Sequence, residues 1–151
     1  MSLFEEKCAV LFHEIGECKK MVLSTSFEDR VTSRMMSIIM LDGLFYFQTD
    51  KSFRKYEQLQ KNRNVALCMD NISVEGYCRE LGHPEENPKF CGLYEKYFPS
   101  AFHRYTRLTK ERLFAVEPIY IKKWIYEEGE PWEEIFDYIH KKYEKRKYLG
   151  I

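Results

Sequence analysis

The chain has 151 residues and carries 24 Lys and Arg against 24 Asp and Glu, so its formal net charge is zero. This length suits one domain with a sizeable core. The balanced charge argues against a general nucleic-acid binder, and no run is apolar and long enough to span a membrane, so we expect neither partner. Five cysteines without a Cys-x-x-Cys pair and four histidines without ligand spacing predict no metal site and a cytoplasmic location.

The first half of the chain reads as a helix followed by three strands. Apolar residues recur at helical spacing over residues 2–17. Residues 19–25, 31–41 and 44–49 predict strands, because they are rich in β-branched, aliphatic and aromatic side chains. Residues 42–43, Asp-Gly, are a favoured two-residue hairpin turn, so the second and third strands are expected to pair.

A second helix and two further strands follow. Apolar positions three residues apart predict a helix over residues 51–61, with Thr49 or Asp50 as its N-cap. Residues 65–69 and 72–81 predict strands joined by a short turn.

The remaining chain mixes helices and strands. Gly76, in mid-strand, indicates a bulge or a close backbone approach. Residues 85–98 predict an amphipathic helix that Pro99 ends. Residues 113–126 predict a bent strand or two short ones, and residues 131–147 a C-terminal helix with one apolar face.

These elements predict a mainly β fold with flanking helices, organised as one domain over residues 1–151 with a core at about 18–126. About six strands with helices inserted between them suit a small antiparallel barrel. A doubly wound parallel sheet would need regular alternation of strands and helices, which is absent.

Polar side chains gather near the junction of the third strand and its helix. Arg34 lies on the preceding strand, and Ser52, Arg54 and Lys55 are expected in the first helical turn. Two cations, a hydroxyl and free backbone N–H groups at a helix start suit a phosphate dianion. On these grounds alone, solvated charges at a helix start are the favoured interpretation, by roughly two to one.

Two runs of the sequence form a paired motif, Arg34-Met35-Met36-Ser37-Ile38 and Phe47-Gln48-Thr49-Asp50-Lys51-Ser52-Phe53-Arg54-Lys55. They resemble the flavin signature of the pyridoxamine 5′-phosphate oxidase family, which reads Arg-Met-Val-Leu-Leu and then Thr-Asn-x-x-Ser-Arg-Lys. Later segments, residues 74–77 and 121–124, also resemble the family, and the likeness extends from about Met21 to Trp124.

The resemblance implies an FMN-binding, six-stranded antiparallel split β-barrel that forms a homodimer, with the cofactor at the subunit interface. The cofactor-binding residues it implies are Arg34, Met35, Met36, Ser37, Ile38, Gln48, Thr49, Ser52, Arg54, Lys55 and Trp124. In this interpretation the backbone of residues 34–38 meets the polar edge of the flavin, and the cations hold its phosphate. Hydride transfer to a flavin needs alignment more than a protein acid or base, so no catalytic side chain is named.

The resemblance further implies an oxidoreductase acting on an unknown small molecule, with NAD(P)H as a candidate electron donor. Alternatives are a nitroreductase-like enzyme of the nitroimidazole-resistance type, a non-catalytic flavin- or haem-binding protein, and a plain β-barrel interaction domain. After Trp124 the chain is acidic and lacks the Arg-Leu-His-Asp-Arg segment of true pyridoxamine phosphate oxidases. We therefore expect little vitamin B6 oxidation and a closer likeness to the small nitroimidazole-resistance and stress-protein branches.

Overall fold

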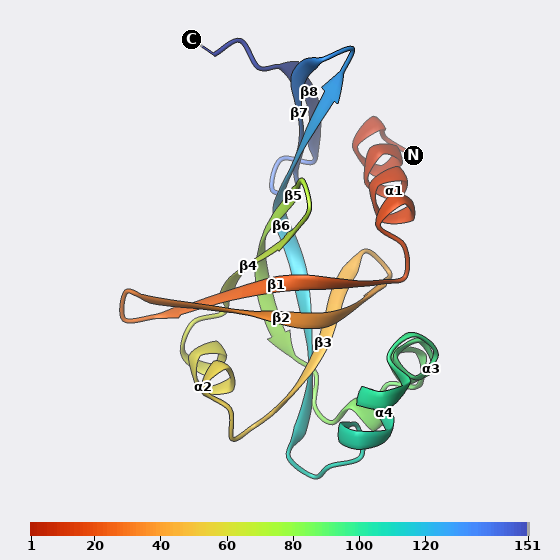
Figure 1. Ribbon diagram of the computed structural model, residues 1–151, viewed down its shortest axis with the longest axis vertical. Helices are drawn as coiled ribbons and strands as arrows, with labels where there is room; N and C mark the ends of the chain where they lie inside the picture. The colour runs from red at the N-terminus through yellow and green to blue at the C-terminus, as the bar shows by residue number, and fades with distance from the viewer. Residues whose placement is uncertain (151) are drawn as a thin grey trace.

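A computed structural model describes residues 1–150 of the chain (Figure 1). In chain order its elements are α1 (Leu3–Ile15), β1 (Cys18–Phe27), β2 (Arg30–Leu41), β3 (Leu44–Asp50), α2 (Arg54–Lys61), β4 (Asn64–Met69), β5 (Ile72–Glu80), the 3₁₀ helix η1 (Pro84–Glu86), α3 (Pro88–Tyr97), α4 (Pro99–Tyr105), β6 (Glu111–Glu127), β7 (Glu130–Asp137) and β8 (Lys142–Lys147).

Strands β1 to β6 form a closed antiparallel barrel. The strand order is β3-β2-β1-β4-β5-β6, and β3 also pairs with β6, which closes the ring. This confirms the predicted six-stranded antiparallel barrel. Strands β7 and β8 add to the edge of β6 beyond the barrel, and they project away from it in Figure 1.

Strand β3 lies between two apolar clusters, because its side chains alternate between its two faces. On the barrel side Phe47 stacks on Phe114 of β6, with ring centroids 5.3 Å apart. On the other side Tyr46 contacts Phe90 of α3, at 6.3 Å between centroids. Helices α3 and α4 thus cover the outer face of β3, and burial on both faces fixes its position.

The residue at the middle of β5, Gly76, sits at a bulge, as predicted. The β5–β6 register shifts between Glu75 and Gly76. A Cβ added at Gly76 would lie 2.4 Å from Cγ1 of Val116, which is fully buried, and 3.1 Å from the carbonyl oxygen of Glu117. The β5 and β6 strands are therefore so close at this position that only glycine fits without a shift of its neighbours.

Gly76→Ala is expected to lower the free energy of unfolding by about 1–3 kcal/mol, because the added methyl group overpacks the β5–β6 contact. Gly92→Ala in α3 is the matched control. Nothing lies within 4 Å of its added Cβ, and replacing Gly by Ala inside a helix stabilises by about 0.5–1 kcal/mol. Urea unfolding of both variants measures the difference, and equal midpoints would contradict the close approach at Gly76.

Helix α2 begins later than predicted. Strand β3 continues through Asp50, since the Lys51 N–H donates to the Lys110 carbonyl at 2.9 Å. The Asp50 carboxylate accepts from the backbone N–H and the hydroxyl of Ser52 instead of capping a helix. The N-cap is Phe53, without a side-chain hydrogen bond. Ser52 therefore precedes the helix and is not part of its first turn.

The predicted helix over residues 85–98 is divided into η1 and α3, and Pro99 starts another helix, α4. Pro at the first position of a helix has no N–H to leave unpaired, so it can begin one helix as it ends another. The segment 113–126 belongs to a single long strand, β6.

The predicted C-terminal helix at 131–147 is wrong, because this segment forms the β7–β8 hairpin. Burial alternates only in part along β7, so local periodicity did not reveal a strand. Strand β7 pairs with the outer half of β6. The Glu133 carboxylate of β7 forms ion pairs with Lys122 of β6 at 2.9 Å and with Arg146 of β8 at 3.0 Å. Further ion pairs join Lys145 to Glu127 and link the basic β8 to its acidic neighbours.

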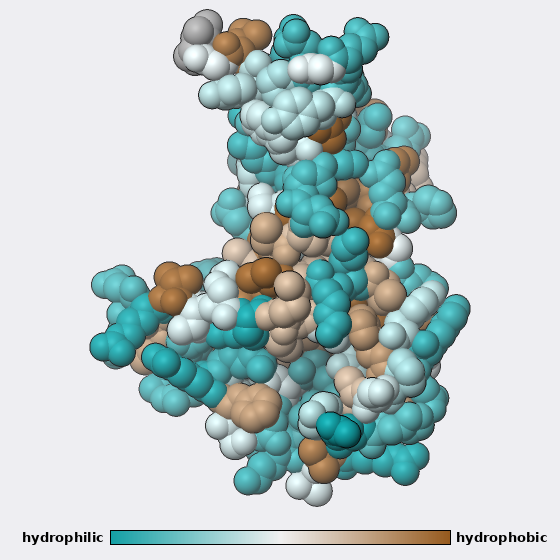
Figure 2. Space-filling view, viewed as in Figure 1, coloured by the Kyte–Doolittle hydropathy of each residue, from teal (hydrophilic) through white to brown (hydrophobic). Residues whose placement is uncertain are grey.

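Figure 2 shows apolar residues gathered toward the centre of one face, with hydrophilic residues over most of the β7–β8 projection. Within residues 1–150 no helix combines the length and apolarity needed to cross a membrane.

Candidate functional site

A gap opens between β2 and β3 as they leave their shared hairpin. The two strands pair only from Leu41 and Leu44 to Ile39 and Tyr46. Beyond that point β2 stays paired with β1, whereas β3 turns away to pair with β6 (Figure 1). The barrel is therefore split at this position.

Along the gap, β2 and β3 each direct backbone N–H and C=O groups toward the other strand without forming hydrogen bonds to it. The Met40 N–H donates to the Glu17 carbonyl on the β1 side at 3.0 Å. Because hydrogen bonding alternates along a strand, Met35 and Ser37 direct their backbone groups toward β3. By the same alternation, counted back from the bond between Lys51 and Lys110, Gln48 directs its backbone groups toward β2. The gap thus offers donors and acceptors to the polar edge of a flat ligand.

A cavity of about 470 Å³ lies at this gap, between the two strands and helices α2, α3 and α4. Its lining residues are Lys20, Met35, Met36, Ser37, Gln48, Thr49, Asp50, Phe53, Lys55, Tyr94, Ala101, Tyr105, Leu108 and Glu111. Its volume lies in the range of small-molecule and cofactor sites. Six of the predicted site residues line it, namely Met35, Met36, Ser37, Gln48, Thr49 and Lys55.

Two buried polar atoms at the cavity lack partners within residues 1–150, Gln48 Nε2 and Thr49 Oγ1. Gln48 is 6% exposed, and the Thr106 hydroxyl donates to its Oε1 at 3.0 Å. Buried polar atoms are usually hydrogen-bonded, since an unpaired one costs about 1–3 kcal/mol. A ligand in this cavity would satisfy both atoms.

Lys55 and the exposed Lys20 line the cavity, and Arg34 lies near Lys55. Lys55 is half-buried, and its burial together with the nearby charge of Arg34 lowers the pKa of its ammonium. Arg34 does not line the cavity, because its guanidinium donates to the Leu23 carbonyl and the Thr25 hydroxyl, at 3.1 and 2.9 Å. Burial also lowers the pKa of Arg34, and two partly buried positive charges near each other favour an anion close to them.

The other predicted site residues lie outside this cavity. Ser52 and Arg54 are exposed, and Ile38 is fully buried in the barrel core. Trp124 lines a separate hollow with Cys68 and Asn71, and its ring packs 5.3 Å from Tyr148. One chain therefore brings the two signature runs together but leaves Trp124 apart from them.

The sequence did not indicate Glu111, which the fold places in the cavity. Its side chain is 5% exposed, and it forms no ion pair among residues 1–150. Burial, followed by the charge of Asp50, raises the pKa of this carboxyl to about 7. Glu133 is similarly buried at 6% but is paired to two cations, and the bond from Lys122 lowers its pKa. Glu111 is therefore a buried carboxyl without the cation pairing that Glu133 has.

The raised pKa of Glu111 predicts a loss of stability at higher pH. An acid whose folded pKa exceeds its unfolded value near 4.5 stabilises the fold when protonated, and this contribution declines as the pH rises from about 4.5 to about 7. Glu111→Gln should therefore raise the free energy of unfolding at pH 8 relative to the wild type by about 1–3 kcal/mol. At pH 4 the two proteins should differ little. Urea titrations at both pH values test this, and an equal difference at both would contradict it.

Solved structures share this architecture at low sequence identity. A pyridoxamine 5′-phosphate oxidase-related, FMN binding protein from Nostoc punctiforme is 13% identical, with 99% of this chain and 98% of that chain covered and a TM-score of 0.66. General Stress Protein 26 from Bacillus anthracis is 23% identical, with 80% and 92% covered and a TM-score of 0.58. A NimC/NimA family protein from Clostridium acetobutylicum is 15% identical, with 94% and 92% covered and a TM-score of 0.56.

The chain has the pyridoxamine 5′-phosphate oxidase-like split-barrel fold. The predicted resemblance is thus confirmed for the fold. No family profile and no curated protein matches the sequence.

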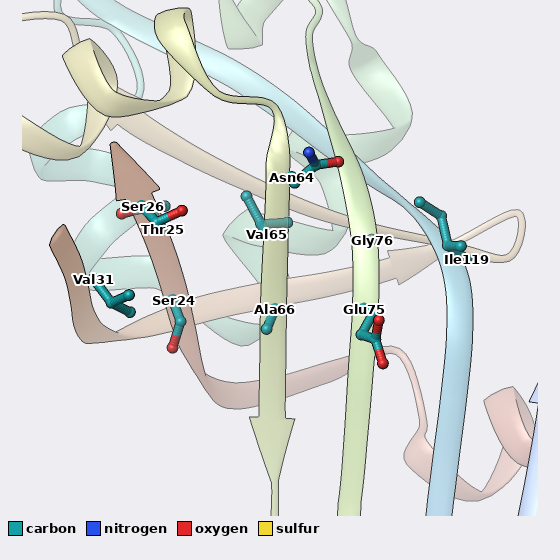
Figure 3. Close-up of a pocket in the computed structure, with 10 residues that line it drawn as sticks. All are labelled: Ser24, Thr25, Ser26, Val31, Asn64, Val65, Ala66, Glu75, Gly76 and Ile119. Atoms are coloured by element: carbon teal, nitrogen blue, oxygen red, sulfur yellow. The ribbon is translucent and has the colours of Figure 1, made fainter. Parts of the chain in front are cut away.

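A second cavity, of about 300 Å³, lies on the split barrel away from the β2–β3 gap. Figure 3 shows its lining residues, which come from β1, β2, β4, β5 and β6. Most are small or uncharged, such as Ser24, Ala66 and Gly76, and none of their buried side-chain atoms lacks a partner. This cavity therefore offers fewer ligand-directed polar groups than the β2–β3 gap.

Proposed function

We propose that this protein binds FMN in the β2–β3 gap and acts as an FMN-dependent oxidoreductase. The observation that carries the proposal is the cavity of about 470 Å³ at the split of the barrel, where Gln48 Nε2 and Thr49 Oγ1 are buried without partners beside Lys55. Proteins of this fold include one described as FMN binding. Isoalloxazine is flat, with apolar faces and one polar edge, which suits a slot between two strands.

The residues of the gap divide by chemistry. Backbone groups of Met35, Ser37 and Gln48 would meet the polar edge of the flavin, and Lys55 with Arg34 would balance the phosphate charge. The apolar side chains of Met36 and Leu108 would exclude water from the ring. FMN supplies hydride acceptance and donation when bound, and the protein supplies position and charge.

We further propose a homodimer, as the family resemblance implies. Trp124 lies apart from the gap within one chain, so its predicted role beside the flavin requires a second subunit. The cavity drawn in Figure 3 carries small side chains such as Ser24 and Ala66, on which such a subunit could pack. A permanent interface should bury on the order of 2,000 Å² or more. Sedimentation that shows a stable monomer still holding FMN at micromolar concentration would overturn the dimer.

A nitroreductase-like activity is the alternative within the same cofactor chemistry, and a NimC/NimA family protein shares the fold. A non-catalytic haem-binding role is a further alternative, because the cavity lining includes Met35 and Tyr105, and Met and Tyr side chains can ligate haem iron.

The visible spectrum of the purified protein, before and after denaturation, tests the cofactor. Flavin absorption that separates from the denatured chain as FMN supports the proposal, and apoprotein that fails to quench added FMN fluorescence would overturn it. Bleaching by NADH or NADPH under anaerobic conditions, reversed by a nitroaromatic or quinone acceptor, distinguishes an oxidoreductase from a flavin carrier. Pyridoxamine 5′-phosphate should give little oxygen consumption.

A further inference from the structure

The β2–β3 gap contains a buried acid that no flavin phosphate contact explains. Glu111 begins β6 opposite Asp50, on the face of the sheet that α3 and α4 cover. Its side chain is 5% exposed and lines the cavity. A carboxylate buried without a cation is costly, whereas a neutral carboxyl can donate a hydrogen bond from its O–H group.

The surroundings of Glu111 favour the neutral form and leave its cavity side open. Gln48 Nε2 lies beside the carboxyl and lowers its pKa, but no well-aligned hydrogen bond joins the two groups. Burial raises the pKa of the Tyr94 hydroxyl to about 12, so it stays protonated. The charged or titratable groups that face Glu111 from the surrounding elements are Asp50 of β3, Lys55 of α2, His83 before η1, Tyr94 of α3 and Tyr105 of α4.

We propose that Glu111 binds the ligand of this cavity in its protonated form, with its O–H group and the Gln48 Nε2 amide both donating to hydrogen-bond acceptors on the ligand. This inference rests on the proposed function, since the cavity is the proposed FMN site. It assigns a direction to the side-chain contacts: the part of the ligand beside Glu111 is a carbonyl or ring-nitrogen acceptor edge and not an N–H donor.

Coupling to a proton follows from this contact. In the ligand-free protein Glu111 loses its proton near pH 7. Above that pH, Glu111 must take up one proton when it binds a ligand that needs its protonated form. The Kd should therefore rise by about tenfold between pH 6 and pH 8. An N–H donor at the same position would give the opposite slope.

The experiment is a fluorescence-quenching titration of apoprotein with riboflavin and with FMN at pH 6, 7 and 8. Riboflavin lacks the phosphate, so its pH profile is free of the phosphate titration and of the phosphate contact with Lys55. The affinity of the wild-type protein for riboflavin should fall by about tenfold from pH 6 to pH 8. Glu111→Gln, which keeps an N–H donor but cannot titrate, should bind with the low-pH affinity at all three values. Calorimetry in two buffers of different ionisation enthalpy should show uptake of one proton by the wild type at pH 8 and none by Glu111→Gln.

Glu117→Gln is the matched control, because Glu117 lies on the same strand but pairs with Arg79 outside this cavity. The pH dependence of riboflavin affinity in Glu117→Gln should match that of the wild type. A flat profile in the wild type, or affinity that rises with pH, would overturn the inference while leaving FMN binding intact. Absence of binding by the wild type at every pH would overturn both the proposed function and this inference.

Discussion

Lys55→Ala is expected to weaken FMN binding by about ten- to a hundredfold while leaving riboflavin binding within about twofold. Lys55 is the half-buried cation that lines the β2–β3 cavity, whereas Lys20, which also lines it, is exposed. A hydrogen bond to a charged group contributes about 1.5–3 kcal/mol, which corresponds to this loss of affinity. Riboflavin has the same ring and ribityl chain but no phosphate, so it isolates the charge contact. Fluorescence quenching of both flavins by apo Lys55→Ala measures the two affinities.

Neighbouring lysine and arginine residues supply the controls for this prediction. Lys51 is exposed and does not line the cavity, so Lys51→Ala should bind both flavins as the wild type does. Arg54→Ala was expected from the signature to lose FMN as well, and the exposed position of Arg54 now predicts a smaller loss than that of Lys55→Ala. If Lys51→Ala loses FMN as severely as Lys55→Ala, or if all three variants retain it, the phosphate lies elsewhere.

Phe114→Ala should produce the largest loss of stability, about 3–5 kcal/mol in the free energy of unfolding. Its ring is fully buried on β6, stacks on Phe47 at 5.3 Å and meets Tyr56 of α2 edge-on at 5.9 Å. Truncation would leave a cavity where the closing strand pair of the barrel and helix α2 meet.

Denaturant unfolding at pH 7 tests this loss, with Tyr126→Ala as the control on the same strand. Tyr126 is 67% exposed, so its removal should change the free energy of unfolding by less than about 0.5 kcal/mol. A loss below about 1 kcal/mol for Phe114→Ala would mean that the interior of the barrel is not packed through β3 and β6.

The local signals in the sequence were strong enough to predict the barrel. The Asp42-Gly43 turn and the flanking apolar runs fixed the β2–β3 hairpin, and Gly76 marked the β5 bulge, because both features depend on residues close in sequence. The C-terminal segment was misassigned because its strand character comes from pairing with β6 and from the ion pairs of Glu133, which are contacts between elements.

The candidate site was predictable only where the two runs of the flavin signature form it. Met35 to Ser37 and Gln48 to Lys55 occupy two runs that a hairpin brings together. Glu111 and Tyr94 reach the cavity from β6 and α3, and nothing in the spacing of the sequence indicated that the fold would bring a buried acid to the flavin signature. Trp124, named by the resemblance, lies in another hollow of the same chain.

Because β2 and β3 separate, the rates of amide hydrogen exchange along β2 should alternate between slow and fast from one residue to the next. The amides of Met36 and Ile38 face β1 and share its ladder, so they should exchange slowly, at rates set by opening of the barrel. Those of Met35 and Ser37 face the gap, and in apoprotein they should exchange orders of magnitude faster than their immediate neighbours. A ligand that bonds to the wall of the gap would slow only these alternate amides, so their exchange reports occupancy of the site residue by residue.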